Sequence, residues 1–331
     1  MSTTLGTPGA GVLQGETPAS GVAPGALAAR TRGLRKTYGE TVAVDNVDLD
    51  VPTGAVLGML GPNGSGKTTT IRMLLGLVRP TGGEVELLGH SMPDGAGKAL
   101  PEVGALVEGP GFHPFLSGRE NLLRLGAAEP GLSGTGIADA VSTALERVGL
   151  SEAAHRRYRG YSLGMKQRLG LAGALLAPRR MVVLDEPTNG LDPAGTREVR
   201  RIIAELHTAG VTVLVSSHLL AEVEATCTHV AVLNAGSVVA QGELSELLES
   251  GSPALLVSTP DGEDAVNALR EKRIPSRLTP AGVRVDLSAT TAPEVLAALV
   301  HAEVPVYEAN RARTGLEDLF ARLTQNGEEQ P

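Results

Sequence analysis

The stretch that decides the fold is a glycine-rich turn after a short apolar run, and it reads Gly61-Pro62-Asn63-Gly64-Ser65-Gly66-Lys67-Thr68. It matches the phosphate-loop pattern GxxxxGK followed by Ser or Thr. The apolar run Val56–Leu60 predicts a buried strand, and residues 68–77 predict the helix that follows. Glycines let the backbone curl so that its N–H groups point at a phosphate, and the helix N-terminus adds partial positive charge. The turn therefore predicts an α/β P-loop nucleotide-binding fold.

The polar side chains at the end of this turn have distinct expected roles. Lys67 is long enough to reach the β- and γ-phosphates, and the hydroxyl of Thr68 is placed to ligate Mg²⁺. Thr69 completes the set of residues 61–69 that we expect to bind the nucleotide. The alternative is a glycine-rich turn that binds nothing, and the correctly placed strand and helix argue against it.

A pair of carboxylates follows a second apolar run, residues 181–184. A buried parallel strand presents side chains to a ligand at its C-terminal end. Asp185 at that end suits coordination of Mg²⁺, directly or through water. Glu186 projects differently and is a candidate to polarise an attacking water. The alternative is a strand followed by a solvated acidic turn, and it is disfavoured because the same chain carries the phosphate loop.

Short β-rich runs alternate with longer helical patterns from residue 30 onward, which is typical of a parallel sheet with crossover helices. Further strands are expected at residues 103–107 and 211–215. Helices are expected at residues 117–126, where Ser117 and Glu120 have capping-box spacing, and at residues 136–148 and 194–208.

Several motifs stand in a fixed order around these two segments: Tyr38, residues 161–168 (Tyr-Ser-Leu-Gly-Met-Lys-Gln-Arg), residues 189–193 (Asn-Gly-Leu-Asp-Pro) and residues 216–218 (Ser-Ser-His). Together with the phosphate loop and the acidic strand end, they resemble the ATP-binding subunits of ABC transporters over about residues 30–245. The resemblance implies an ABC ATPase domain with a helical signature subdomain, which binds ATP and Mg²⁺ and works as a homodimer.

The signature motif of that family is typically LSGGQ, and here it reads YSLGM. The resemblance implies that Ser162 and Gly164 contact the γ-phosphate of the ATP that the opposite subunit holds. Leu163 and Met165 depart from the family pattern, which puts a close approach of the backbone at position 163 in question.

Three other residues take their roles from the same resemblance. Asp192 is implied at the dimer interface, His218 as the residue that senses the γ-phosphate, and Tyr38 as the residue that stacks on adenine. Taken singly, a histidine after a strand more often has a structural role, and a tyrosine usually belongs to local packing. The joint order of the motifs outweighs these alternatives, but less firmly for Tyr38 than for His218.

Glu108 stands where the family has a glutamine that contacts the metal, so the resemblance makes it a candidate Mg²⁺ ligand; the alternative is a charged loop residue with no metal role. The segment 109–122 after it resembles the surface where the membrane partner docks. Phe112 and Phe115 lie in this segment, and clustered aromatic residues favour an interface. A local packing cluster explains the aromatic residues equally well.

A second unit follows from about residue 251, with the expected order strand (254–258), helix (263–272), strand (275–278), strand (283–287), helix (292–301) and strand (304–308). This βαββαβ order is that of a ferredoxin-like α+β fold. A last helix is expected at residues 316–323. The unit looks like the accessory domain of ABC-2 type exporter ATPases, the drug- and bacitracin-resistance kind.

Composition narrows the class of protein. The 331 residues carry a formal net charge of -8, which disfavours a nucleic-acid partner, and the single Cys227 excludes an intrachain disulfide. No apolar run approaches the ~18 residues that a membrane helix needs. Residues 1–29 hold one charge, Glu16, and lack the basic start and apolar block of a secretory signal, so we expect a flexible tail there. The expected domains are residues 30–250 and 251–331.

These observations predict an ATPase subunit that dimerises around two ATP molecules. We expect it to drive a separate integral membrane permease from the cytoplasmic face of the membrane, for export of a drug, antibiotic or peptide. The alternative is an ABC protein that acts on ribosomes or DNA; relatives of that kind carry two cassettes or a long coiled coil, and this chain has neither. An importer ATPase is disfavoured because importers of sugars typically append a β-barrel-type domain.

Overall fold

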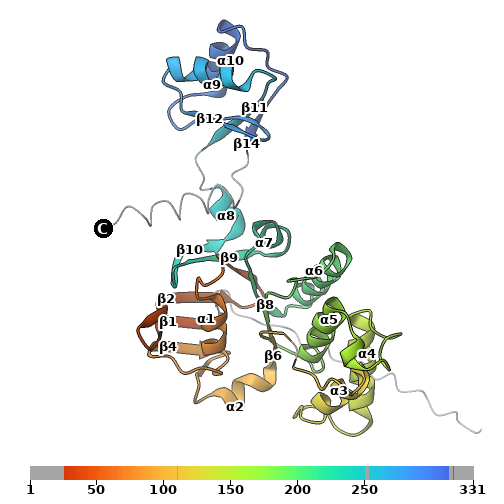
Figure 1. The fold of residues 1–331 in the computed structure, drawn as a ribbon. Helices are drawn as coiled ribbons and strands as arrows, with labels where there is room; N and C mark the ends of the chain where they lie inside the picture. Colours follow the sequence, from red (N-terminus) through yellow and green to blue (C-terminus); the bar gives the residue numbers. More distant parts are fainter. Residues whose placement is uncertain (1–25, 110, 250–252, 313–315, 317–331) are drawn as a thin grey trace, which may run out of the picture.

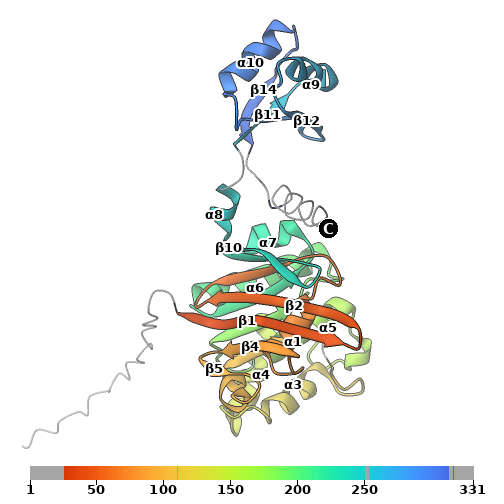
Figure 2. The ribbon, with the colours of Figure 1, turned by 90° about the vertical axis from the view of Figure 1, so that its left-hand side faces the viewer.

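The structure is a computed structural model, and it describes residues 26–109, 111–249, 253–312 and 316. The N-terminal part of the described chain contains two sheets. A four-stranded antiparallel sheet has the order β2-β1-β4-β5 and consists of β1 (Leu27–Tyr38), β2 (Thr41–Pro52), β4 (Gly82–Leu87) and β5 (His90–Ser91). Figure 2 shows the broad face of this sheet.

The second sheet has six strands in the order β10-β9-β3-β8-β7-β6. Its members are β3 (Val56–Leu60), β6 (Val103–Leu106), β7 (Met181–Asp185), β8 (Thr212–Ser217), β9 (His229–Asn234) and β10 (Ser237–Glu243). The five strands from β9 to β6 run parallel, and β10 pairs antiparallel with β9. Strands β3, β7 and β8 are buried along their whole length, which explains their uninterrupted apolar runs.

Helices cover both faces of the parallel sheet (Figure 1). The α-helices of this part are α1 (Lys67–Leu74), α2 (Ala96–Ala99), α3 (Gly118–Gly126), α4 (Thr135–Arg147), α5 (Leu163–Ala174), α6 (Pro193–Thr208), α7 (Leu220–Thr226) and α8 (Leu244–Glu249), and two 3-10 turns are η1 (Leu100–Glu102) and η2 (Tyr158–Gly160). Alternate residues of β3 face different cores: Leu57 packs with α1 and the antiparallel sheet, whereas Val56 packs with α6, α7 and the helices α3–α5.

The second unit has the predicted βαββαβ order, which confirms the ferredoxin-like assignment. Its elements are β11 (Ala254–Ser258), α9 (Gly262–Glu271), β12 (Ser276–Thr279), β13 (Gly282–Asp286), α10 (Ala292–His301) and β14 (Glu308–Ala312). The sheet order is β12-β13-β11-β14, all antiparallel. Both helices pack on one face of it, where Leu269, Val295 and Leu299 are fully buried. Figures 1 and 2 show this unit standing beyond α8.

Most expected elements of the nucleotide-binding part are also confirmed, with small shifts at their ends. The helix expected at 68–77 is α1 and ends at Leu74, because Gly76 turns the chain at a positive φ of 68°. The capping box is present: Glu120 N–H donates to Ser117 Oγ at 3.2 Å, and Ser117 N–H donates to Glu120 Oε2 at 2.7 Å. These hydrogen bonds lower the pKa of Glu120 below its ordinary value.

Two boundaries were wrong. The expected strand 304–308 lies instead at Glu308–Ala312, because Pro305 has no N–H for a ladder and Val304 is buried in a loop position, 6% exposed. The flexible tail does not extend to residue 29, because β1 begins at Leu27. Ala28 and Ala29 are 2% exposed beside β2 and β4, where small side chains fit closely. Residues 1–25 and the expected helix from 317 to 323 lie outside the described residues.

Leu316 follows the second unit in sequence but packs into the first. It is fully buried in the same apolar cluster as Val223, Cys227 and Leu244. Its backbone N–H donates to Oε1 of Glu224 in α7 at 2.5 Å. The neighbouring Cys227 is 9% exposed, and burial raises the pKa of its thiol to about 12. The division of the chain near residue 251 stays a prediction, and Leu316 belongs to the packing of the nucleotide-binding unit.

We expect Leu316→Ala to lower the free energy of unfolding of the nucleotide-binding unit by ~2–5 kcal/mol, because it leaves a cavity in a closed core. Urea unfolding followed by circular dichroism measures the change. Leu278→Ala is the matched control, because Leu278 is 55% exposed and its loss should change stability by about 0.5 kcal/mol or less. Equal effects of the two substitutions would show that Leu316 does not anchor the chain.

Candidate active site

Two glycines of the phosphate loop, Gly61 and Gly66, have no room for a side chain. A Cβ added to Gly61 would lie 2.5 Å from Ser65 Oγ and would clash with the carbonyl of Leu233. Gly66 has φ of 98°, which disfavours any other residue, and its α-carbon faces the carbonyl of Ala43. The loop is therefore a tight cradle of backbone between β3 and α1, as the sequence predicts.

The ammonium group of Lys67 points into this loop. The side chain is 6% exposed, and Nζ donates to the carbonyl oxygens of Gly61 at 2.7 Å and Pro62 at 3.1 Å. Nζ also lies 3.5 Å from Oε1 of Glu186. The cation thus sits at the mouth of the cradle and beside the carboxylate that follows β7.

Asp185 and Thr68 are far apart in sequence and touch in the structure. The hydroxyl of Thr68 donates to Oδ2 of Asp185 at 2.9 Å, and the hydroxyl of Ser216 donates to Oδ1 at 2.6 Å. Asp185 is 7% exposed, so the two hydrogen bonds satisfy a nearly buried carboxylate. Ser216 also accepts the backbone N–H of Glu186 at 2.9 Å. Its role was missed from the sequence, although a serine at the C-terminal end of an apolar strand, next to the strand that carries Asp185, was a usable signal.

The oxygen atoms of Thr68 and Asp185 fit the preference of Mg²⁺ for hard oxygen ligands. Within the described residues no group of three or more His, Cys, Asp or Glu side chains is placed to hold a metal. Mg²⁺ usually takes one or two protein oxygens and completes its shell with phosphates and water. The assignment of these two residues to Mg²⁺ stays a prediction.

Glu186 lies between the side chains of Lys67 and His218. Oε2 lies 2.6 Å from Nδ1 of His218, and Oε1 faces Lys67. The backbone of Glu186 has φ of 49°, a conformation that costs of order 1 kcal/mol for a residue with a side chain. Strain of this kind survives where surrounding contacts over-determine it, and here the Ser216 hydroxyl and the His218 ring hold the residue from both ends. The structure thus brings together the candidates for binding and for hydrolysis.

The signature segment begins α5 and packs on the loop before α6 in the same chain. Ser162 is the N-cap of α5, and its Oγ accepts the N–H of Met165 at 3.3 Å. Leu163, which departs from the family pattern, is 57% exposed and contacts Gly190, which has φ of 72°. A side chain at position 190 would collide with Leu163. The sequence did not predict this pairing.

The remaining residues of these motifs sit on exposed edges. Gly164 faces Leu191, at 3.3 Å from an added Cβ. Asp192 caps α6 by accepting the N–H of Gly195 at 2.8 Å, and its backbone carbonyl accepts from Thr196. Tyr38, at the end of β1, is 47% exposed, with Lys36 Nζ 5.0 Å from its ring centroid. The roles of these residues toward ATP stay predictions.

Glu108 forms an ion pair with Arg72 of α1, which the sequence did not predict. Its backbone has φ of 59°, and its side chain is 57% exposed. Glu108 nevertheless lines the same cavity as Asp185 and Glu186, with a volume of about 560 Å³. The residue is therefore near the predicted metal position, with a competing partner on α1.

The two phenylalanines of the expected docking segment behave differently. Phe112 packs edge-on against Tyr158, with ring centroids 5.5 Å apart. Phe115 is 60% exposed, with the guanidinium of Arg159 5.6 Å from its centroid. Beside Phe112 a groove of about 330 Å³ runs between the end of β6 and α5, with Leu125 on its rim. One aromatic residue thus belongs to local packing and the other is available to a partner.

A phosphate loop, a buried Asp–Thr–Ser contact and a strained glutamate beside a histidine define a P-loop ATPase. The ABC transporter family pattern matches residues 44–189. The bacitracin transport ATP-binding protein BcrA of Enterococcus faecalis is 35% identical over 90% of this chain and 96% of the relative. The daunorubicin/doxorubicin resistance ATP-binding protein DrrA of Streptomyces peucetius is 38% identical over 73% and 74%. An ATP-binding cassette solved as a dimer in a post-hydrolysis state with ADP and Pi has a TM-score of 0.60 at 26% identity, over 65% of this chain and 98% of that one.

This chain belongs to the ABC transporter family of ATP-binding proteins and is an ATPase of that family. It resembles the bacitracin- and drug-resistance members, as the sequence motifs predicted. No helix among the described residues is long and apolar enough to cross a membrane.

We expect Lys67→Ala to weaken ATP binding by roughly 10- to 100-fold, because charged hydrogen bonds in a confined site are lost. Isothermal titration calorimetry gives the dissociation constant. Lys98→Ala serves as control, because Lys98 is an exposed lysine of α2 outside the loop. An unchanged dissociation constant for Lys67→Ala would contradict the phosphate-loop assignment.

We expect Glu186→Gln to keep ATP binding but slow hydrolysis by roughly 10²- to 10⁴-fold, because an amide polarises water poorly and accepts no proton. Phosphate release gives the rate, and size-exclusion chromatography with ATP and Mg²⁺ should then detect a trapped dimer. Glu84→Gln, which changes an exposed carboxylate of β4, should leave the hydrolysis rate and the oligomeric state unchanged. A monomeric Glu186→Gln variant with normal turnover would remove Glu186 from the mechanism.

We expect Glu108→Gln to make ATP binding depend less steeply on Mg²⁺. A carboxylate near the γ-phosphate repels ATP unless a metal lies between them. At low Mg²⁺ the variant should bind ATP more tightly, and at saturating Mg²⁺ the difference should shrink.

The ion pair with Arg72 supplies a matched variant for this titration. Arg72→Gln leaves the Glu108 carboxylate without its partner, so the dependence on Mg²⁺ should become steeper than in the unmodified chain. Parallel titration curves for all three proteins would mean that Glu108 serves only as the partner of Arg72.

Proposed function

We propose that this chain is the ATP-hydrolysing subunit of an exporter, in which two copies close around two ATP molecules and drive a separate integral membrane permease. The observation that carries the proposal is the assembly of Lys67, Asp185, Glu186 and His218 at one edge of the parallel sheet. These residues come from three strand ends, so their contact is a property of this fold and not of one local motif.

In this proposal the backbone N–H groups of residues 61–69 and the ammonium of Lys67 bind the phosphates, and Tyr38 stacks on the adenine. Thr68 and Asp185 hold Mg²⁺, with Glu108 as a further candidate ligand, and the ion neutralises phosphate charge when bound. Glu186 orients a water for attack on the γ-phosphorus and accepts its proton, while ADP leaves with the β-phosphate oxygen. His218 holds the carboxylate of Glu186 from the side opposite Lys67.

The proposal includes a second copy of the chain because the signature lies open. The described partner of Ser162 Oγ is the N–H of Met165, which leaves the O–H of an exposed residue to donate elsewhere. Asp192 is likewise exposed. Ser162 and Gly164 are therefore available to the γ-phosphate held by a partner, and Asp192 is available to the dimer interface. The likeness to a cassette solved as a dimer supports this arrangement.

The groove beside Phe112 and the exposed ring of Phe115 are the surface that we assign to the permease. A largely apolar groove, with the exposed ring of Phe115 and the guanidinium of Arg159 close by, suits a short amphipathic helix of a membrane protein. Docking there would place the chain at the inner face of the cell membrane. Export of a drug, antibiotic or peptide is proposed because BcrA and DrrA are named for bacitracin transport and daunorubicin resistance.

The test is copurification of the tagged chain from its native membrane in mild detergent. We expect an integral membrane protein to copurify, and Phe115→Asp to abolish this while ATP hydrolysis by the chain alone continues, because a buried carboxylate opposes docking. Leu77→Asp is the control, since Leu77 is 62% exposed and lies outside the groove. Copurification of ribosomes or DNA instead, with no membrane protein, would refute the export proposal.

A further inference from the structure

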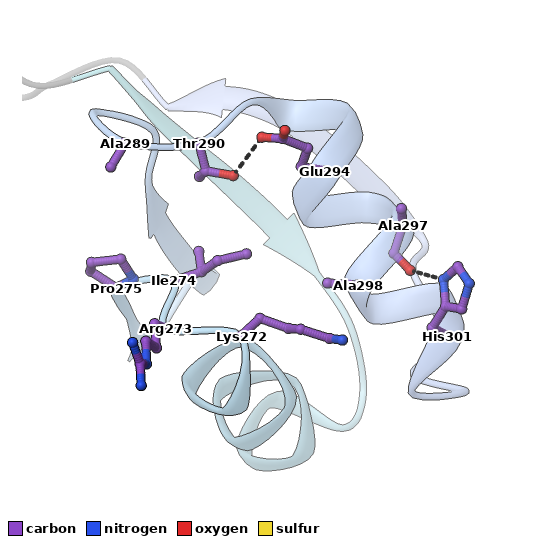
Figure 3. Close-up of a pocket in the computed structure, with 10 residues that line it drawn as sticks. All are labelled: Lys272, Arg273, Ile274, Pro275, Ala289, Thr290, Glu294, Ala297, Ala298 and His301. Atoms are coloured by element: carbon purple, nitrogen blue, oxygen red, sulfur yellow. Dashed lines mark hydrogen bonds between the residues drawn. The ribbon is translucent and has the colours of Figure 1, made fainter.

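The C-terminal unit contains a cavity of about 450 Å³ between α10 and the loop that follows α9 (Figure 3). One face of α10 forms a wall, with lining residues at positions 294, 297, 298 and 301, which is the spacing of one helical face. Ala297 and Ala298 are small and leave space between the helix and the loop. Ile274 supplies an apolar floor and packs against the core of the unit.

The mouth of the cavity is cationic. Lys272 and Arg273 are exposed and form no hydrogen bond or ion pair through their side chains within the described part of the chain. Figure 3 shows Lys272 reaching from the end of α9 toward α10, and Arg273 projecting from the other side of the loop. His301 donates its Nδ1–H to the carbonyl of Ala297 at 2.7 Å, so its Nε2 edge remains for another partner.

Glu294 is the one acidic residue that lines the cavity, and it is hydrogen-bonded at the N-terminus of α10. Glu294 accepts the backbone N–H of Thr291 at 2.8 Å and the hydroxyl of Thr290 at 3.0 Å. These hydrogen bonds lower its pKa, so the carboxylate is ionised, and both of them are accepted by Oε2 at the helix N-terminus. One carboxylate against Lys272 and Arg273 leaves a net charge of +1 at the cavity, in a chain whose net charge is -8.

We propose that this cavity binds a small amphipathic anion, with one carboxylate, sulfonate or phosphate group at Lys272 and an apolar body against Ile274, Ala297 and Ala298. Arg273 adds positive charge from the other side of the loop. The volume lies in the range of small-molecule sites, and the combination of a cationic mouth with an apolar wall selects for such a ligand. A free inorganic anion would use the mouth alone. The site does not depend on the proposed export function, because no residue of the nucleotide site lines it.

The probe is 1-anilinonaphthalene-8-sulfonate, which has one sulfonate and an aromatic body, titrated by fluorescence into the full chain at low salt. We expect saturable binding of one probe per chain. The double variant Lys272→Gln/Arg273→Gln should raise the dissociation constant roughly 10-fold, because the anionic group loses its charged partners. Arg270→Gln is the matched control, because Arg270 is exposed on α9 but does not line the cavity, and it should change the constant less than about twofold.

The apolar half of the site is tested separately by Ala297→Leu, which places a larger side chain in the cavity from an exposed position of α10. We expect a roughly 10-fold weaker binding of the probe, since the space for the apolar body is filled. Inorganic phosphate should compete only weakly. Binding that neither the double variant nor Ala297→Leu alters would overturn the proposal. Phosphate competing as well as an aromatic sulfonate would also overturn it, because the apolar wall would then contribute nothing.

Discussion

The contact on which the rest of the site depends is the one between the buried carboxylate of Asp185 and the hydroxyls of Thr68 and Ser216. It joins the ends of three neighbouring elements, because β3 leads into α1, β7 ends at Asp185 and β8 carries Ser216 in register with it. A carboxylate that is 7% exposed needs both hydrogen bonds to stay where it is. Parallel register therefore determines where the candidate metal ligands and the candidate base lie.

Glu186 and His218 extend this contact outward. The hydroxyl of Ser216 serves two neighbours, since it donates to Asp185 and accepts from the backbone N–H of Glu186. That second bond helps to hold Glu186 in its left-handed backbone conformation, with the carboxylate between Lys67 and His218. Nucleotide-binding and hydrolytic candidates are thus parts of one hydrogen-bonded network. Leu316 packs into the same unit and donates its backbone N–H to Glu224 of α7, the helix that follows His218.

Sequence patterns predicted the elements whose signals are local. The capping box at Ser117 and the apolar strands 56–60 and 181–184 need only neighbouring residues to be recognised, and each is present. The pairing of β1 with β4 was not predicted, because its partners lie far apart in sequence, as Ala29 and Leu87 do at an interval of 58 residues. The hairpin of β1 and β2 was also missed, although its partners are close in sequence, as Tyr38 and Thr41 are. The strand placed at 304–308 failed for a related reason, since a Val-Pro-Val run resembles a strand locally, while pairing with β11 selects residues 308–312.

The sequence by itself determined the class of protein and the candidate residues for binding and hydrolysing ATP, because phosphate-binding loops and acidic strand ends are short motifs with a chemical reason for each residue. Only the tertiary structure decided which partner each of these residues has. Arg72 forms an ion pair with Glu108, and Leu163 packs on Gly190. Ser216 donates a hydrogen bond to Asp185, and Leu316 packs into the nucleotide-binding unit although it follows the C-terminal unit in sequence. These pairings depend on how strands and helices pack across the chain, and side-chain contacts of that kind have no periodicity or spacing that a single sequence displays.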